Sequence, residues 1–312
     1  MTTTLRVGVV GAGRVGAVLS SALRDAGHLV VAAAGESDAS RRRIEQLLPG
    51  VPIAKPSAVA RACDLLLLTV PDDMLGNVVS MLAASGSLRE GQIVAHTSGR
   101  HGLAVLAAAT AVGARPLAIH PAMTFTGTAI DLPRLSGCVF GVTVGADERA
   151  VAERLVADLG GRPVWVEEER RTLYHAGLAH GANHLVTLVA EAREVLAASG
   201  ADDPSAILRP LLTAALDNAL AAGDAALTGP IVRGDVQTVE AHLADLQAHA
   251  PQSVASYVAL ARATLGRVVT DGRVLPIRAA RIIALLDGAT RAVVPGPAAT
   301  AEPAGDEGGP TR

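Results

Sequence analysis

Two polar residues that could act on a substrate follow apolar segments of this sequence. Ser98 comes shortly after the segment 93–96, and His120 directly follows 115–119. A histidine donates and accepts protons near neutral pH, and a serine hydroxyl can orient a substrate oxygen. Pro121 would hold the turn after His120 rigid. Both are therefore candidate catalytic residues, although a histidine at a strand end can instead cap the backbone.

A third group of candidates lies in the segment 174–184, which holds three of the nine histidines. His175 or His180, together with Asn183, could bind or protonate a substrate. On a helix, His180 and His184 would share one face, and such a pair can chelate a metal. No further ligand stands at metal-type spacing, so we predict no metal site.

The scaffold for these residues is indicated by the N-terminal segment LRVGVVGAGRVGAVLSSALR. It reads as a buried strand, a glycine-rich turn and a helix, which is typical of a dinucleotide-binding unit. The first glycine permits the tight turn, the second lets the backbone approach a pyrophosphate, and the third lets the helix pack closely. Free N–H groups at the helix start would face the phosphates. The predicted binding residues of this turn are Gly11, Gly13, Arg14, Val15 and Gly16.

The tip of the second predicted strand, 28–34, bears on the choice between NAD and NADP. An acidic residue there binds the ribose hydroxyl and repels a 2′-phosphate, and Glu36 could be that acid. Ser37 and the arginines after it could instead hold a phosphate at the next helix start. Because Glu36 lies just past the tip, we predict NADP bound by Ser37, Arg41 and Arg42, with NAD as the alternative.

Further apolar segments predict a mostly parallel sheet with helices on both faces. The remaining strands are expected at 51–54, 64–70, 93–96, 115–119, 137–144 and 163–166. The strand 64–70 ends in Val70-Pro71, at the edge where the nicotinamide half of a cofactor should lie. Val70 and Pro71 therefore complete the predicted cofactor site.

The sequence pattern changes after residue 166. Ala- and Leu-rich helical patterns then cover about 168–200, 204–222, 235–249, 252–266 and 276–290. We predict an α/β protein with a Rossmann-like domain at 1–166, an all-α domain at 167–292 and a disordered Pro/Gly/Ala-rich tail at 293–312. In the turn 228–235, Arg233 could bind a substrate carboxylate or pair with Asp235.

Composition excludes several classes of protein. A net charge of −3 gives no reason to expect nucleic acid as a partner, and no apolar run reaches the roughly 20 residues that span a bilayer. Two cysteines without metal-type spacing, and a start without an apolar leader, indicate the cytoplasm. Small residues in the helical part would permit close helix approach, so we expect a homodimer through that part.

Together these motifs resemble the bacterial Rossmann-like family that carries domain of unknown function 2520. The resemblance covers about residues 5–290. It rests on GAGRVG at 11–16, Val-Pro at 70–71, HTSG at 96–99, His-Pro and Thr-Phe within 120–125, Tyr-His-Ala and Asn within 174–183, and TGP and RGD within 228–235. It implies an NAD(P)-binding domain and a helical domain similar to that of 6-phosphogluconate dehydrogenase. Relatives include ketopantoate reductase, pyrroline-5-carboxylate reductase and prephenate dehydrogenase.

One residue type of these relatives is missing here. In ketopantoate reductase and the β-hydroxyacid dehydrogenases, a lysine on the first long helix of the second domain is the general acid. The single lysine of this chain, Lys55, belongs to the N-terminal domain. Either His175 or His180 replaces that lysine, or the chemistry runs from His120. Prephenate dehydrogenase is the better analogue, since it also has a serine after one late strand and His-Pro after the next.

These observations predict an NADP-dependent oxidoreductase that transfers a hydride to or from a small carbonyl or hydroxy-acid substrate. His120 or His175 would be the acid/base, and Ser98 and Asn183 would orient the substrate oxygen. One alternative is a ketopantoate reductase-like enzyme. The other is a non-catalytic NADP(H)-binding sensor or regulatory protein.

Overall fold

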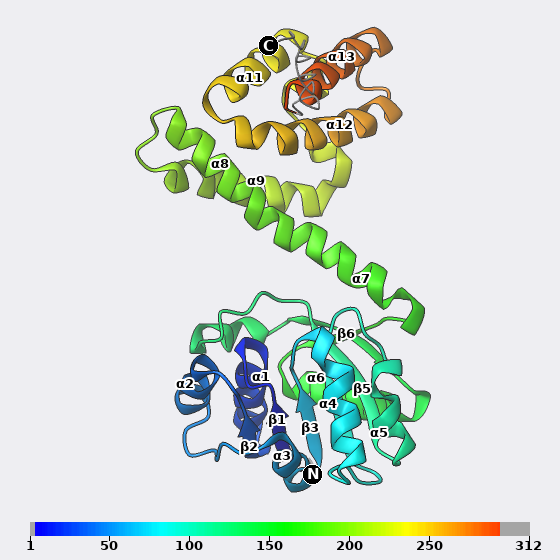
Figure 1. Ribbon diagram of the computed structural model, residues 1–312. Coiled ribbons are helices and arrows are strands. Elements are labelled where there is room, and N and C mark those ends of the chain that lie inside the picture. The colour runs from blue at the N-terminus through cyan, green and yellow to red at the C-terminus, as the bar shows by residue number, and fades with distance from the viewer. Residues whose placement is uncertain (1–3, 294–312) are drawn as a thin grey trace, which may run out of the picture. The chain divides into compact units, whose positions relative to one another are not determined.

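The computed structural model describes residues 4–293 and divides the chain into two compact units, Met1–Ala182 (unit 1) and Asn183–Arg312 (unit 2). Figure 1 labels their elements. The division falls inside a π-helical turn, Ala179–Asn183. The domain boundary predicted at residue 166 follows the last strand and stays a prediction. Apart from residue 293, the predicted tail lies outside the described residues.

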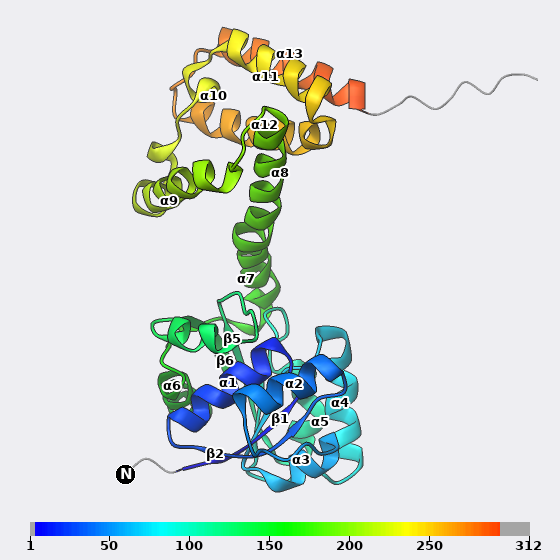
Figure 2. The same ribbon diagram turned by 90° about the vertical axis from the view of Figure 1, so that its left-hand side faces the viewer.

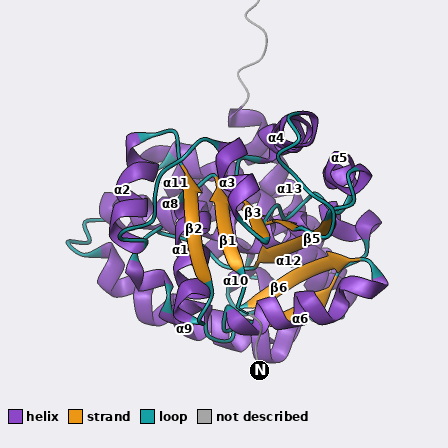
Figure 3. Ribbon diagram, turned by 90° about the horizontal axis from the view of Figure 1, so that it is seen from below, coloured by secondary structure: helices purple, strands orange, loops and turns teal. Residues whose placement is uncertain are grey.

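Unit 1 is built on a seven-stranded sheet with the order β2-β1-β3-β4-β5-β6-β7 (Figure 3). Neighbouring strands run parallel except β5 and β6, which are antiparallel. The predicted mostly parallel sheet is thus confirmed. The strands are β1 (Arg6–Val10), β2 (Leu29–Ala34), β3 (Leu65–Leu68), β4 (Ile93–His96), β5 (Arg115–Pro121), β6 (Val139–Val144) and β7 (Arg162–Trp165).

Helices cover both faces of this sheet, which explains why its central strands are apolar throughout. Successive side chains of β3 point to opposite faces: Leu65 and Leu67 pack into one core, and Leu66 and Leu68 into the other. The first core lies under α1 (Arg14–Asp25), α2 (Asp38–Leu47) and α6 (Arg149–Asp158). The second lies under α3 (Pro56–Ala62), α4 (Asp72–Ala84) and α5 (Ala107–Ala111).

The strand predicted at 51–54 is wrong. This segment makes a single parallel bridge, Ala33 to Ile53, beside β2. Its hydrogen bonds run from Ala33 N to Pro52 O (3.0 Å) and from Ala54 N to Ala33 O (2.9 Å). Pro52 has no N–H to donate, so the pairing does not extend into a ladder.

Unit 1 ends with α7 (Arg171–Leu178), and the described part of unit 2 is entirely helical, as predicted. Its core is formed mainly by α11 (Val236–His249), α12 (Val254–Thr270) and α13 (Pro276–Val293), which Figure 2 shows together. The other helices are α8 (His184–Ala198), α9 (Pro204–Ala222) and the short α10 (Pro230–Arg233). Among the described helices, none combines the length and apolar character required to cross a bilayer.

Candidate functional site

The glycine turn after β1 is fastened to the end of β3. Gly11 has φ +91°, and a Cβ atom there would lie 2.7 Å from the backbone nitrogen of Val70. Thr69 Oγ1 donates a hydrogen bond to Gly11 O at 2.6 Å. A Cβ atom at Gly16 would collide with the same Thr69 hydroxyl. The first and third glycines are thus required by packing, and Val70 lies beside the turn.

The second glycine, Gly13, is different because its surroundings are open. A Cβ atom at Gly13 would meet only Gly11 O, at 3.7 Å. Gly13 is also the N-cap of α1, where no side chain caps the helix and no acidic residue stands in the first turn. Arg14 is exposed beside these N–H groups. An open backbone at an uncapped helix start fits a pyrophosphate group.

The residues predicted to choose the cofactor lie at the start of α2. Ser37 is the N-cap of α2, and its Oγ accepts the Ser40 N–H at 3.1 Å. Arg41 and Arg42 are exposed. Arg43, the third arginine of this run and not among the predicted binding residues, precedes the buried Ile44. A Cβ atom at Gly127 would lie 2.8 Å from Arg43 Nε and 2.9 Å from Arg14 Cγ, so both arginines lie against one loop.

His96, at the end of β4, is fully buried and holds the following loop. Its Nε2 donates to Gly102 O at 2.8 Å, and its Nδ1 accepts the Ser98 N–H at 3.1 Å. Burial lowers the pKa of His96 to about 4, so the ring is neutral near pH 7. Ser98 is buried too, and its Oγ accepts the His101 N–H at 3.1 Å. Its hydroxyl hydrogen is not used in that bond.

His120 lies inside β5, opposite Gly141 of β6, one residue before the strand ends. Its Nδ1 is 3.1 Å from the Tyr174 hydroxyl of α7. The His120 ring meets the rings of both Tyr174 and His175 edge-on, each with a centroid separation of 5.7 Å. Burial, and then the charge of Arg171, lowers the pKa of His120 to about 4. The structure thus brings His120 and His175 together.

Two glycines make this close approach of rings possible. A Cβ atom at Gly99 would collide with the His175 ring and lie 3.1 Å from His120 Nε2. A Cβ atom at Gly141 would lie 2.5 Å from Cζ of the Tyr174 ring. Any side chain at either position would therefore displace one of the aromatic rings.

Arg171, the first residue of α7, was not foreseen as part of the site. Its side chain is fully buried, and its NH1 group donates to Gly141 O at 3.3 Å and Thr143 Oγ1 at 3.1 Å. Its NH2 group donates to Ser98 O. Nothing in the sequence distinguishes it from the neighbouring exposed Arg170, because its burial depends on where α7 meets the sheet.

Two family models match the chain in succession. A Rossmann-like domain model matches residues 1–121, and the model for domain of unknown function DUF2520 matches residues 138–264. The chain therefore contains a Rossmann-like domain followed by a DUF2520 domain. The resemblance stated from its motifs is thereby confirmed. A search of the curated proteins gives no match to this DUF2520 chain.

Solved structures similar to this DUF2520 chain share its fold at low sequence identity. Protein BF3122 from Bacteroides fragilis, named as an NADP oxidoreductase, is 20% identical with a TM-score of 0.73, covering 84% of this chain and 98% of that one. A reductive aminase from Aspergillus terreus in complex with NADPH is 18% identical, TM-score 0.61, covering 90% and 99%. Pyrroline carboxylate reductase from Plasmodium falciparum with NADP bound is 11% identical, TM-score 0.54, covering 93% and 98%.

The other predicted residues are not gathered around His120 within unit 1. His180 is exposed in the π-helical turn, and Asn183 belongs to unit 2, so its catalytic role stays a prediction. Within residues 4–293, no three His, Cys, Asp or Glu side chains are grouped to hold a metal ion. Asp235 caps α11 by accepting from Thr238 N (3.1 Å) and Oγ1 (2.7 Å). It therefore stabilises that turn through Thr238.

Proposed function

We propose that this DUF2520 protein is an NADP(H)-dependent oxidoreductase of small carbonyl or hydroxy-acid compounds, with His120 as its proton-transferring residue. The observation that carries the proposal is the cluster of His120, Tyr174 and His175 at the carboxyl end of β5. β1, β3, β4 and β5 run parallel, so this cluster and the glycine turn after β1 stand at the same edge of the sheet. That edge is where open α/β sheets bind their ligands.

The proposed cofactor site is supported by the open backbone at Gly13 and the uncapped start of α1. Gly11 to Gly16 would hold the pyrophosphate, and Val70 and Pro71 would border the nicotinamide half. Ser37, Arg41 and Arg42 would hold the 2′-phosphate. The reductase from Plasmodium falciparum and the aminase from Aspergillus terreus contain NADP or NADPH, which favours the phosphorylated cofactor. Once bound, the nicotinamide supplies or accepts the hydride.

His120 is placed to serve the substrate through Nε2. Tyr174 engages its Nδ1, so Nε2 is the ring nitrogen left to meet a substrate oxygen. A neutral imidazole can polarise a carbonyl and stabilise the charge that develops on its oxygen. Ser98 has an unused hydroxyl hydrogen on the neighbouring loop and would orient the same oxygen.

The charge of this cluster favours a carbonyl over a positively charged iminium as the acceptor. Arg171 carries a buried positive charge, and its hydrogen bonds go to neutral oxygens rather than to carboxylates. A buried cation that is not hydrogen-bonded to a carboxylate raises the cost of bringing a second cation nearby. An oxygen that becomes negative during reduction is stabilised by the same charge.

Parallel fluorescence titrations with NADPH and NADH test the cofactor first. We expect NADPH to bind at least about tenfold more tightly, since a bidentate arginine–phosphate contact is worth more than 1 kcal/mol. Tighter binding of NADH would overturn the phosphate assignment and make Glu36 the ribose ligand. Absence of binding by both would overturn the oxidoreductase proposal itself.

His120→Ala and His175→Ala variants test the chemistry, with His242→Ala, an exposed position in unit 2, as the matched control. His120→Ala should lower turnover by about 100-fold or more and leave NADPH binding unchanged. Unchanged turnover in both site variants would contradict the mechanism. NADPH binding by the wild type without oxidation, across 2-oxo acids (ketopantoate included), aldehydes and imines, would instead establish the sensor function.

The proposal extends to pairing of two copies through unit 2. Helix α9 is apolar on several sides yet buries only Leu208, and α8 buries no residue. Leu211 is 62% and Leu220 79% exposed on α9. Leu211 also lines a groove of about 910 Å³ that is formed chiefly by α8, α9, α11 and α12. Apolar helices of this kind are normally covered, and a second copy brings both an identical groove and identical helices.

Sedimentation equilibrium tests this pairing. The wild-type protein should be a dimer at micromolar concentration, and Leu211→Glu should shift it toward monomer because a carboxylate would be buried in the interface. Glu240→Lys, at an exposed position of α11 that does not line the groove, is a control that should leave the dimer intact. A monomeric wild-type protein would show that a second copy of the chain does not occupy the groove.

A further inference from the structure

Arg171 is the one large charged side chain in this part of unit 1 that is fully buried. Its partners are the carbonyl oxygens of Ser98 and Gly141 and the hydroxyl of Thr143. Its Nε has no hydrogen-bond partner within the described residues. A buried cation held by neutral oxygens is costly, so its retention calls for a reason other than stability.

The oxygens bound by Arg171 come from two places on the sheet edge. Ser98 lies on the loop after β4, while Gly141 and Thr143 belong to β6. The Arg171 guanidinium therefore joins the start of α7 to the loop after β4 and to β6. Three residues earlier, Glu168 reinforces this attachment, because its carboxylate accepts the N–H groups of Leu103 (2.6 Å) and Ala104 (3.1 Å). The beginning of α7 is thus fixed on two sides.

This attachment decides where Tyr174 lies. Tyr174 follows Arg171 by three residues and so stands on the same face of α7, with its ring 6.0 Å from the guanidinium carbon. The ring fits over Gly141, where a Cβ atom would lie 2.5 Å from the phenolic oxygen. This places the Tyr174 hydroxyl 3.1 Å from His120 Nδ1, where it can donate its hydrogen to a neutral ring. In a ring whose Nδ1 accepts that hydrogen, the imidazole hydrogen resides on Nε2.

We propose that Arg171 is a positioning residue: it anchors α7 to the sheet so that Tyr174 fixes the ring orientation and the Nε2–H tautomer of His120. The proposal deepens the proposed function, because it explains how His120 would present a hydrogen to a substrate oxygen. It also explains why a positively charged residue stands at position 171. A protonated His120 could not accept a hydrogen bond from Tyr174, and the charge of Arg171 keeps the His120 ring neutral, so that its Nδ1 can accept.

The titratable and charged groups that face His120 all bear on this arrangement. Burial has the largest effect on the pKa of His120, followed by the lowering effects of Arg171 and His175; Asp72 acts in the opposite direction. These groups come from α7, from the start of α4 and from β4; they are Arg171, Tyr174, His175, Asp72 and His96. Of these, Arg171 is the permanent cation, so its removal should raise the pKa of His120.

Nitrogen-15 NMR of the full-length protein tests the proposal without any substrate. Signals of His120 are assigned by their loss in His120→Gln. In the wild type we expect an Nε2–H tautomer and no protonation until well below pH 6. Arg171→Met should produce a mixture of tautomers and raise the titration midpoint by at least about one pH unit, which is a tenfold change in proton affinity.

Three further variants separate positioning from charge and from general damage. Tyr174→Phe should also mix the tautomers, while the charge of Arg171 keeps the midpoint low. Arg171→Lys retains the positive charge but lacks the branched set of guanidinium donors. It should therefore produce a mixture of His120 tautomers with little change in the titration midpoint of His120. It carries the test if Arg171→Met does not fold. Arg89→Met, at the opposite edge of the sheet, removes another arginine that binds a backbone carbonyl and should leave the His120 signals unchanged.

An unchanged His120 tautomer in every folded Arg171 variant would overturn the proposal, as would an equal change in Arg89→Met. Turnover is a second readout: Arg171→Lys should lower kcat about tenfold or more with NADPH affinity preserved, because misplacing the proton donor acts on the transition state. These NMR results stand even if no substrate is found. Failure of the positioning role and failure of the proposed function are therefore distinguishable.

Discussion

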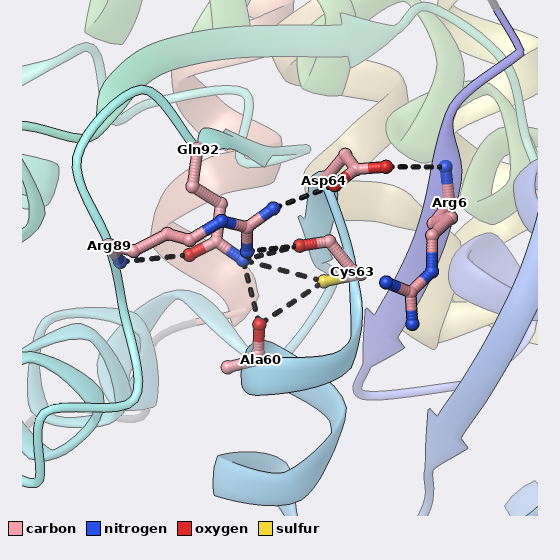
Figure 4. Close-up of polar contacts among 6 residues, drawn as sticks. All are labelled: Arg6, Ala60, Cys63, Asp64, Arg89 and Gln92. Atoms are coloured by element: carbon pink, nitrogen blue, oxygen red, sulfur yellow. Dashed lines mark hydrogen bonds and ion pairs between the residues drawn. The ribbon is translucent and has the colours of Figure 1, made fainter.

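Two polar clusters stand at opposite edges of the same sheet, one at the starts of its strands and the other at their ends. The amino-end cluster consists of Ala60, Cys63, Asp64, Arg89 and Gln92, at the starts of β3 and β4 (Figure 4). The carboxyl-end cluster consists of His96, Ser98, His120, Arg171, Tyr174 and His175. Each contains an arginine bonded to backbone carbonyl groups, and each joins segments distant in the sequence. They differ in how completely their charges and hydrogen bonds are satisfied.

In the amino-end cluster, charges and hydrogen bonds are matched. Arg89 donates to Cys63 O and to the Asp64 carboxylate, both at 2.7 Å, and the other Asp64 oxygen accepts the Arg6 N–H at 3.2 Å. Gln92 donates to Ala60 O at 2.7 Å. Burial raises the pKa of the Cys63 thiol to about 11, so it stays protonated and unreactive. This cluster is a structural junction.

In the carboxyl-end cluster the matching is incomplete. Arg171 donates its hydrogen bonds to neutral oxygens rather than to a carboxylate and leaves Nε without a hydrogen-bond partner within the described residues, and the pKa values of His96 and His120 are both lowered to about 4. Perturbed titratable groups held together at some cost to stability are typical of functional sites. The comparison teaches that the polar residues of this sheet differ by edge. At the amino ends of the strands their charges and hydrogen bonds are matched, whereas at the carboxyl ends a buried cation and two histidines of lowered pKa remain available for function.

The largest expected effect is a loss of stability in acid that originates at the carboxyl-end cluster. In the folded protein the pKa values of His96 and His120 lie near 4, below the ordinary value of 6.5, so the unfolded chain binds more protons between these values. Stability is therefore complete above about pH 6.5 and is lost as the pH falls toward 4, by up to roughly 3 kcal/mol for each histidine.

Urea unfolding followed by the fluorescence of Trp165 measures this effect in unit 1, because Trp165 is the only tryptophan and lies in β7. His96→Gln should unfold at lower urea near pH 7 yet lose about half as much stability on acidification as the wild type. If His96→Gln lost as much unfolding free energy on acidification as the wild type, the loss of stability in acid would arise outside His96. The contrast between the two clusters would then weaken.

The next effect separates the clusters by a matched pair of glycine substitutions. Gly99→Ala inserts a methyl group against the His175 ring and 3.1 Å from His120 Nε2. Turnover should fall about 100-fold, because the rings that meet the substrate are displaced. Gly8→Ala inserts the same methyl group 2.8 Å from Cys63 Sγ and 2.8 Å from Val59 Cγ1, in the dry core.

For Gly8→Ala we expect a loss of roughly 1–3 kcal/mol from overpacking, with turnover per folded molecule unchanged. Urea unfolding and steady-state kinetics on both variants measure the two losses. Should Gly8→Ala impair turnover as much as Gly99→Ala, the site would depend on the whole sheet rather than on its carboxyl edge.

The sequence predicted those parts of the fold that depend on local pattern. The run LLLL at 65–68 indicated a strand buried on both faces, and Gly11 and Gly16 indicated a turn packed against the sheet; packing confirms both. The segment 51–54 had the composition of a strand, but the missing N–H of Pro52 and its place beside an edge strand reduced it to a single bridge.

The arrangement of the candidate site was only partly predictable. Ser98 and His120 were found because each follows an apolar strand at the ligand-binding edge. Arg171 could not be found, because its burial depends on where α7 docks, 73 residues after Ser98 in the chain. His96 looked like the last residue of a strand, and its role in holding the loop depends on a bond to Gly102 O. Such long-range docking leaves no periodic signal in the sequence.

The smallest effect that we predict concerns Gln92, in the amino-end cluster. Gln92→Leu places an apolar side chain of similar size at this position and removes the donor that Ala60 O and Cys63 O share. Arg89 still donates to Cys63 O, so Ala60 O is the acceptor that loses its amide donor and keeps only the weaker Cys63 thiol, at 3.5 Å. Exchanging an amide donor for a thiol alone should cost about 1 kcal/mol in the unfolding free energy of unit 1.

Trp165 fluorescence in urea measures that cost, and NADPH titration and kinetics accompany it. Because Gln92 stands at the starts of the strands, NADPH affinity and turnover per folded molecule should remain those of the wild type. Gln92→Glu is the matched control: it keeps the shape but places a carboxylate against the same carbonyl oxygens, so it should cost at least as much stability. Loss of turnover in either variant, at a pH where the protein stays folded, would mean that the two edges are coupled through β3 and β4. The proposed distinction between a structural cluster at the amino ends of the strands and a functional cluster at their carboxyl ends would then be wrong.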